Sequence, residues 1–189
     1  MTDRDARARY LAPVIAEIRA QSAKKSVIKV LEVGCGNCIN LVELKEEFGD
    51  LVELSGFDLS PGRLDVARAY FGDRLDGTAT AEASIVEPTP AEDRDQFDVV
   101  FSMHCLEQIP YAATQAVENL HARSRDCVIM IEPVWEFARL AQKLKLMRSD
   151  YIRTLLPAAK YLGYTIEKAE PLGFESTLKN QTSLVVLRK

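Results

Sequence analysis

Two glycines and a downstream aspartate have the spacing of a nucleotide-binding turn. Gly34 and Gly36 follow a β-prone apolar run and precede a helical pattern that begins near Asn40. Two glycines allow a sharp turn and let a ligand approach the backbone, while the first amides of the following helix point at that ligand. Asp58 comes 22 residues after Gly36, close to the offset at which a carboxylate accepts hydrogen bonds from a ribose. This pattern predicts a nucleotide site.

The glycine turn departs from two common nucleotide motifs. A dinucleotide fingerprint requires glycine where Ile39 stands, which disfavours a nicotinamide dehydrogenase. A P-loop requires a Gly-Lys-Ser/Thr that this turn lacks. What remains is an acidic residue two positions before the first glycine, Glu32-x-Gly34-x-Gly36. Because an unpaired carboxylate is costly inside an apolar strand, we expect Glu32 to meet a ligand or a helix dipole.

Two titratable residues follow a later apolar run. His104 and Glu107 come just after FDVVF, residues 97–101, at the end of the expected sheet where ligands collect in open α/β folds. Either side chain could take a proton from a substrate hydroxyl or amine, since histidine titrates near neutral pH and burial raises the pKa of glutamate. A structural polar role is the alternative for each residue.

Cys35-x-x-Cys38 is also a signature of redox and zinc sites. A second pair of ligands is not evident, because Cys105 and Cys127 are isolated in the sequence. We therefore interpret Cys35 and Cys38 as small residues of the turn and expect no metal. Four cysteines are too few for a disulfide framework in a chain of 189 residues, so we expect thiols.

Apolar runs alternate with helical patterns along the chain, which predicts an α/β fold with a doubly wound, mostly parallel sheet. The expected strands are residues 27–33, 51–57, 80–85, 97–101, 127–132, 165–170 and 182–188. The expected helices are residues 6–20, 40–48, 61–71, 111–122 and 136–148, with a further helix ending near residue 162. The last two strands are separated by about eleven residues, which is short for a helical crossover and predicts an antiparallel hairpin. No linker divides the chain, so we expect one domain over residues 1–189.

Composition narrows the possible partners. With 47% apolar and 28% charged residues, the chain has the balance of an ordinary globular protein. The 24 Lys and Arg residues against 28 Asp and Glu residues disfavour broad nucleic-acid binding. No apolar run approaches the roughly 20 residues of a membrane helix, and the first 25 residues lack the apolar core of a signal peptide. We therefore expect a cytoplasmic protein that does not enter the membrane.

Together these segments resemble the class I S-adenosylmethionine-dependent methyltransferases. The first motif of that superfamily, Glu/Asp-x-Gly-x-Gly-x-Gly, matches Glu32, Gly34 and Gly36, with Cys38 in place of the third glycine. The segments FDVVFSMHCLEQIP, CVIMIEPVWEF and YLGYTIEKAEPLGF are similar to its fourth strand, its fifth strand and the passage toward its C-terminal hairpin. The resemblance covers residues 27–189 and implies a seven-stranded Rossmann-like sheet with an antiparallel C-terminal hairpin.

The resemblance implies S-adenosylmethionine as cofactor and a role for individual residues. Glu32 would orient the methionine end, Gly34 and Gly36 would pass close to the methionine and ribose parts, and Asp58 would hold the ribose hydroxyls. The other cofactor-binding residues that it implies are Leu59 on the adenine face, Ser84 and Ile85 near the adenine amino group, and Ser102 and Met103 beside the donor.

The resemblance also implies methyl transfer to a small-molecule oxygen, nitrogen or carboxylate. Residues 1–25 would form a cap helix over the cleft, residues 27–132 the cofactor-binding core, and residues 133–189 the substrate-side helices and the hairpin. After FDVVF the chain lacks the Asn/Asp-Pro-Pro-Tyr motif of methyltransferases that act on adenine or glutamine, which disfavours polymeric acceptors. A peptide or tRNA acceptor, and a non-catalytic subunit that binds S-adenosylmethionine or a partner, remain the alternatives.

The expected substrate side carries many cations. Residues 135–168 contain seven Lys and Arg against three Asp and Glu. Solvated helix faces are the simpler interpretation of this excess. An anionic acceptor steered by Arg139, Lys143 or Arg148 is the alternative.

Overall fold

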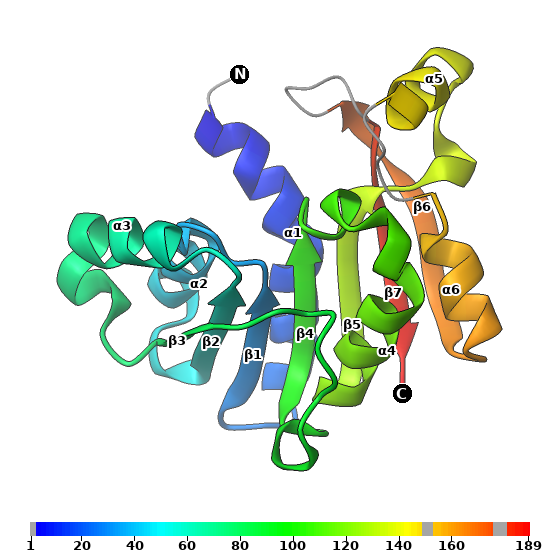
Figure 1. Cartoon of the computed structure of the whole chain (residues 1–189). Helices are drawn as coiled ribbons and strands as arrows, with labels where there is room; N and C mark the ends of the chain where they lie inside the picture. Colours follow the sequence, from blue (N-terminus) through cyan, green and yellow to red (C-terminus); the bar gives the residue numbers. More distant parts are fainter. Residues whose placement is uncertain (1–2, 149–152, 176–180) are drawn as a thin grey trace.

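The computed structural model describes residues 3–148, 153–175 and 181–189 and shows seven strands in one sheet (Figure 1). The strands lie in the order β3-β2-β1-β4-β5-β7-β6. Their bounds are β1 Ile28–Val33, β2 Val52–Asp58, β3 Ala79–Glu82, β4 Phe97–Met103, β5 Ser124–Pro133, β6 Thr165–Glu175 and β7 Gln181–Arg188. The first five strands pair in parallel, and β7 lies antiparallel between β5 and β6. The expected doubly wound sheet and its C-terminal hairpin are confirmed.

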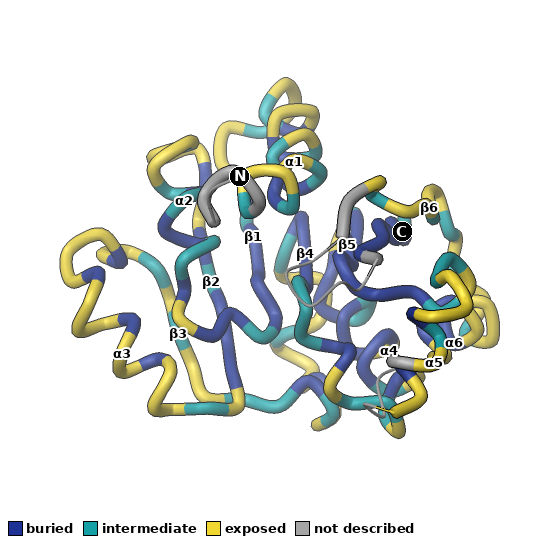
Figure 2. The backbone as a smooth tube through the Cα atoms, turned by 90° about the horizontal axis from the view of Figure 1, so that it is seen from above, coloured by how far each residue is buried: buried dark blue, intermediate teal, exposed yellow. Residues whose placement is uncertain are grey.

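Helices cover both faces of the sheet because both faces of its central strands are apolar. Val30 and Leu31 are neighbours in β1, yet they belong to two different buried clusters. The cluster of Val30 contains residues of α1, α2 and α3, and the cluster of Leu31 contains residues of α4 and α6. The helices are α1 Asp3–Ser22, α2 Ile39–Phe48, α3 Pro61–Phe71, α4 Ala113–Arg123, α5 Leu140–Arg148 and α6 Leu155–Tyr161. Figure 2 shows the buried strands between more exposed helices.

The N-terminal helix α1 packs on the sheet. Leu11, Val14 and Ile18, spaced for one helical face, are almost completely buried against β1, β4 and β5. Pro13 lies inside the helix. The ring of Tyr10 meets the ring of His104 edge-on, with 5.2 Å between their centroids. This contact brings α1 to the carboxyl edge of the sheet.

The connection from β3 to β4 is held by side chains of α4. The expected strand at residues 80–85 is the shorter β3, and residues 83–96, which the structure describes in full, contain no α-helix. The buried amide Nδ2 of Asn119 donates to the carbonyls of Ile85 and Glu87 at 2.5 and 2.8 Å. Arg123 Nη1 donates to Thr89 Oγ1 at 2.8 Å. These bonds position residues 85–89 without a covering helix.

The helix expected at residues 136–148 is divided. A 3₁₀ turn spans Trp135–Phe137, and α5 begins at Leu140. Gln142 Oε1 accepts a hydrogen bond of 2.9 Å from the amide of Arg139, as the N3 residue of a capping box does, which makes Arg139 the N-cap of α5. Within the described ranges, no helix combines the length and the apolar character needed to cross a membrane.

Candidate functional site

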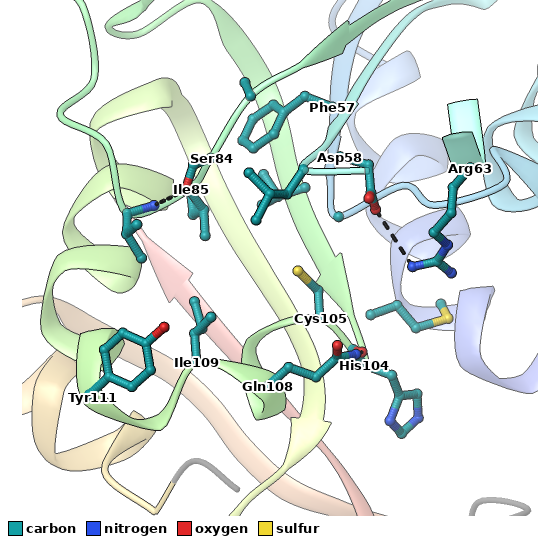
Figure 3. A pocket seen from close by; sticks show the side chains of 16 residues that line it. Phe57, Asp58, Arg63, Ser84, Ile85, His104, Cys105, Gln108, Ile109 and Tyr111 are labelled. Atoms are coloured by element: carbon teal, nitrogen blue, oxygen red, sulfur yellow. Dashed lines mark hydrogen bonds and ion pairs between the residues drawn. The ribbon is translucent and has the colours of Figure 1, made fainter. Parts of the chain in front are cut away.

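A cavity of about 340 Å³ opens at the carboxyl ends of β1, β2 and β4 (Figure 3). The chain leaves β1 toward β2 on one side and β4 lies on the other, so the cavity is at the point where ligands bind in open α/β sheets. The lining includes these residues that the sequence singled out: Gly34, Asp58, Leu59, Ser84, Ile85, Met103 and His104. Glu32, Gly36, Ser102 and Glu107 are buried beside these elements and are not among the lining residues.

The glycine loop is fastened to the end of β2. The amides of Gly34 and Cys35 donate to the carbonyl of Phe57 at 2.8 and 3.0 Å. Gly34 and Gly36 have φ angles of 71° and 54°, which favour glycine. A Cβ atom on Gly34 would lie 2.2 Å from Cys105 Sγ, so this glycine also allows the loop to pack against the segment after β4.

Cys38 adopts the backbone conformation that a glycine would take. Its φ angle is 58°, and it directly precedes α2. Left-handed backbone is uncommon for a side chain other than glycine, asparagine or aspartate. Cys38, which stands at the position of the third motif glycine, therefore has a backbone conformation that glycine adopts readily.

Asp58 joins β2 to the glycine loop. Its Oδ2 accepts a hydrogen bond of 2.8 Å from the amide of Gly36, and its Oδ1 accepts one of 2.9 Å from the amide of Ser60. Arg63 Nη1 lies 3.8 Å from Oδ2. Each carboxylate oxygen has two lone pairs, so both oxygens can accept a further bond from a ligand in the cavity.

Glu32 is buried at the end of β1 with one oxygen unsatisfied. Its Oε1 accepts a hydrogen bond of 2.6 Å from Asn40 Nδ2 in the first turn of α2. Its Oε2 has no hydrogen-bond partner among the described residues. Burial raises the pKa of Glu32 to about 8. A cationic group beside Glu32 would favour its charged form.

The wall opposite Asp58 is mainly apolar. Ile85, Val86 and Ile109 line it together with Tyr111, whose hydroxyl points into the cavity in Figure 3. Leu59 stands at the rim, and 70% of it is exposed. This combination can hold a flat aromatic ring between aliphatic side chains.

His104 is among the lining residues of the cavity, and its ring points away from Ile85 (Figure 3). The imidazole Nδ1 lies 3.6 Å from Glu107 Oε2, and Nε2 lies 3.3 Å from Thr182 Oγ1. Burial opposes the charged ring, but Glu107 and the buried charge of Glu132 outweigh it, so the pKa of His104 is raised. His104 also has a φ of 51°, a strained value that its surroundings must maintain.

Glu132, which is not among the residues singled out from the sequence, maintains that turn. It is fully buried at the end of β5. Its Oε1 accepts hydrogen bonds from the amides of Cys105 and Leu106 at 3.1 and 3.2 Å, and its Oε2 accepts one from the backbone amide of Glu107 at 3.4 Å. Burial raises the pKa of Glu132 to about 7. A carboxylate closing an apolar run is the signal that drew attention to Glu32, and it could have identified Glu132 too.

The sequence also did not indicate several residues that line the cavity. Arg63, Val86 and Ile109 lie within a few residues of selected positions, but no local pattern marks their side chains as parts of a cavity. Trp135 is not among the lining residues, and Lys143 Nζ lies 5.3 Å from the centre of its ring. The cavity is also not lined by Arg139, Lys143 or Arg148, the cations that could steer an anionic acceptor.

Comparison with known proteins decides the family. A family profile described as a methyltransferase domain matches residues 30–145, which is more than half of the chain. The chain belongs to this methyltransferase family. No curated protein matches its sequence. S-adenosylmethionine is its methyl donor, and the chain is an enzyme of methyl transfer.

Solved structures share the fold of this methyltransferase. The PH0226 protein from Pyrococcus horikoshii has a TM-score of 0.70 at 18% identity, over 100% of this chain and 92% of that one. An S-adenosylmethionine-dependent methyltransferase from Aquifex aeolicus has a TM-score of 0.66 at 13% identity, over 97% and 92%. Geranyl diphosphate C-methyltransferase from Streptomyces coelicolor, in complex with S-adenosyl-L-homocysteine, has a TM-score of 0.67 at 10% identity, over 92% and 79%.

Proposed function

We propose that this methyltransferase transfers the methyl group of S-adenosylmethionine to a small-molecule oxygen, nitrogen or carboxylate. The observation that carries the proposal is one cavity flanked by the glycine loop, Asp58 and the turn that holds His104 and Glu107. Its volume of about 340 Å³ lies in the range of small-molecule sites. The donor supplies a methyl group already activated on a sulfonium.

The donor side of the proposal rests on charge and shape. The buried Oε2 of Glu32 and the buried Oγ of Ser102 have no hydrogen-bond partner among the described residues. Such atoms call for a polar group, and the cationic methionine end would supply one. Asp58 would accept from the ribose hydroxyls with its remaining lone pairs. The adenine would lie between Leu59 and Ile85, with Ser84 at its edge and Met103 near the methyl group.

The acceptor side of the proposal is the far side of His104. Its ring faces Tyr10 and Thr182, which come from α1 and β7. Glu107 would hold the imidazole so that it takes the proton of an acceptor hydroxyl or amine. The chain's main contribution would be to align the acceptor with the methyl carbon, since an activated donor needs little further chemistry.

Cations near the proposed acceptor side, beyond His104, indicate the class of acceptor. The cations Arg139, Lys143 and Arg148 lie at or near α5, which stands at the carboxyl edge of the sheet in Figure 1. They favour an acceptor with negative charge. We also propose that the chain is divided by role. Residues 1–25 would be a cap helix, residues 27–132 the donor core and residues 133–189 the acceptor region.

Two measurements test the proposal. Calorimetry of the full chain with S-adenosylhomocysteine should show binding at one site, and absence of heat would overturn the donor site. Labelled donor should then methylate members of a panel of anionic and neutral small molecules. Transfer confined to tRNA or peptides would contradict the small-molecule acceptor. Binding of the donor without transfer to any member of the panel would also contradict the small-molecule acceptor.

A further inference from the structure

The C-x-x-C pair lies in the glycine loop with its sulfur atoms close together. Cys35 Sγ and Cys38 Sγ are 3.8 Å apart. The amide of Cys38 donates to the carbonyl of Cys35 at 2.8 Å, which closes a four-residue turn. Such a turn keeps its end Cα atoms within about 7 Å, and disulfides span Cα distances of about 4.4–6.8 Å. The backbone therefore already has the spacing of a disulfide.

The surroundings make one thiol of the pair more acidic than the other. Cys38 directly precedes the ten-residue helix α2, where amide groups favour a thiolate. Contact with the Cys35 thiol lowers the pKa of Cys38 against the opposing effect of burial. The same contact, together with burial, raises the pKa of Cys35. Cys38 is thus the more acidic thiol of the pair, and Cys35 is the neighbour within reach of its sulfur. Both side chains are buried, with exposed fractions of 4% for Cys35 and 1% for Cys38, so only a small oxidant that enters the loop can reach them.

We propose that Cys35 and Cys38 form a redox modification site, which a hydroperoxide converts to a disulfide. The Cys38 thiolate attacks one peroxide oxygen, the O–O bond breaks, and the leaving oxygen departs as water or alcohol after taking a proton. Cys35 sulfur then attacks the sulfenic sulfur of Cys38, the S–O bond breaks, and water leaves with the Cys35 proton. The two thiols lose two electrons, and the peroxide gains them.

A metal site explains the pair less well. Within the described ranges, no group of three or more His, Cys, Asp or Glu residues could hold a metal ion. Cys105 is a further thiol beside the loop, since its sulfur lies 2.2 Å from the position that a Cβ on Gly34 would take. Burial raises the pKa of Cys105, so it remains protonated.

Disulfide formation should reshape the loop. The sulfur atoms must approach from 3.8 Å to about 2.0 Å. Gly36 lies between the two cysteines, and its amide makes the 2.8 Å hydrogen bond to Asp58. Closing the turn should disturb this bond and so weaken donor binding. Bound donor should protect the thiols in return, because coupling between two sites is reciprocal. This effect on affinity rests on the proposed donor site, whereas disulfide formation does not.

Peptide mapping tests the modification itself. Both cysteines lie in the tryptic fragment of residues 30–45, between Lys29 and Lys45, whereas Cys105 and Cys127 lie in other fragments. After treatment with hydrogen peroxide and alkylation, we expect this fragment to carry no alkyl group and to be lighter by two hydrogens. A fragment that stays doubly alkylated, that is linked to Cys105, or that carries only sulfinic or sulfonic acid would overturn the proposal.

Calorimetry with S-adenosylhomocysteine tests the consequence. Peroxide should weaken binding to the wild-type chain about tenfold or more, and dithiothreitol should restore it. Cys38→Ser should keep its affinity after the same treatment. Unchanged affinity of a chain whose disulfide is proven would overturn the effect on donor binding. If the reduced chain itself does not bind, the donor site fails while the peptide map still decides the disulfide.

Discussion

Asp58 Oδ2 accepts a hydrogen bond of 2.8 Å from the amide of Gly36, so one carboxylate both shapes the glycine loop and lines the cavity. Its second oxygen binds the amide of Ser60 at the start of α3. The residue proposed to hold the ribose is therefore also a structural link between two loops. A variant at this position must be judged by affinity and stability together.

Asp58→Ala should abolish measurable donor binding, because the loop and the ribose lose the same acceptor. Loss of a hydrogen bond to a charged group costs about 1.5–3 kcal/mol, so a decrease of at least about tenfold is expected from the ribose alone. Calorimetry with S-adenosylhomocysteine measures the affinity, and thermal unfolding reports the loop. Asp65→Ala, which removes an exposed carboxylate of α3, is the matched control. Wild-type affinity of the Asp58 variant would contradict the ribose role.

Gly34→Ala should destabilise the chain more than Gly36→Ala. Both positions have positive φ, but the new methyl group at position 34 would lie 2.2 Å from Cys105 Sγ and 2.6 Å from its Cβ. At position 36 it would meet the end of the flexible Arg63 side chain at 2.6 Å. Chemical denaturation should show a loss of about 1–3 kcal/mol for Gly34→Ala.

A double variant identifies the cause of the loss of stability in Gly34→Ala. Adding Cys105→Gly to Gly34→Ala should recover part of the stability, because it removes both contacted atoms. Equal losses for the two single variants would show that φ strain, rather than the contact with Cys105, decides the effect.

Stability should fall as the pH rises through neutrality. Burial raises the pKa of Glu32 from the ordinary 4.5 to about 8, so the folded chain binds more protons than the unfolded chain between these values. The contribution of Glu32 to stability is complete below about pH 4.5 and is lost by about pH 8. Glu132 behaves in the same way up to about pH 7.

Glu32→Gln should therefore flatten the decline in stability that the wild type shows as the pH rises to about 8. Thermal unfolding of the wild type and the variant between pH 6 and 9 measures this decline. Glu53→Gln, at an exposed position on β2, should keep the wild-type decline. A Glu32 variant that declines as steeply as the wild type would show that Glu32 is not the group that titrates.

The pKa values of the two histidines should be shifted in opposite directions from the ordinary value. The pKa of His104 is raised because Glu107 and Glu132 outweigh its burial, and the pKa of His121 is lowered by burial and by Lys189. NMR of the imidazole protons should resolve two midpoints, which His121→Gln assigns. Glu107→Gln should lower the midpoint of His104 and move the acidic limb of the rate profile to lower pH. Movement of the His121 midpoint instead would contradict the pairing.

The sequence by itself determined the layers of the fold and the location of the site. Consecutive apolar residues such as Val30 and Leu31 point to opposite faces of a strand, so helices must cover both faces of the sheet. The short link between the last two strands excluded a crossover helix. The offset from Gly36 to Asp58 follows from one strand–helix–strand unit, so local spacing sufficed to bring the two together.

Other parts of the site were decided by the tertiary structure. Glu132 reaches the amides of Cys105 and Leu106 across 27 and 26 residues, because β5 lies beside β4. His104 meets Thr182 across 78 residues, because β7 enters the sheet next to β5. Periodicity and turn chemistry are local properties of a chain and can be read along it. Contacts between distant residues depend on strand order and register, which the packing of the whole domain selects.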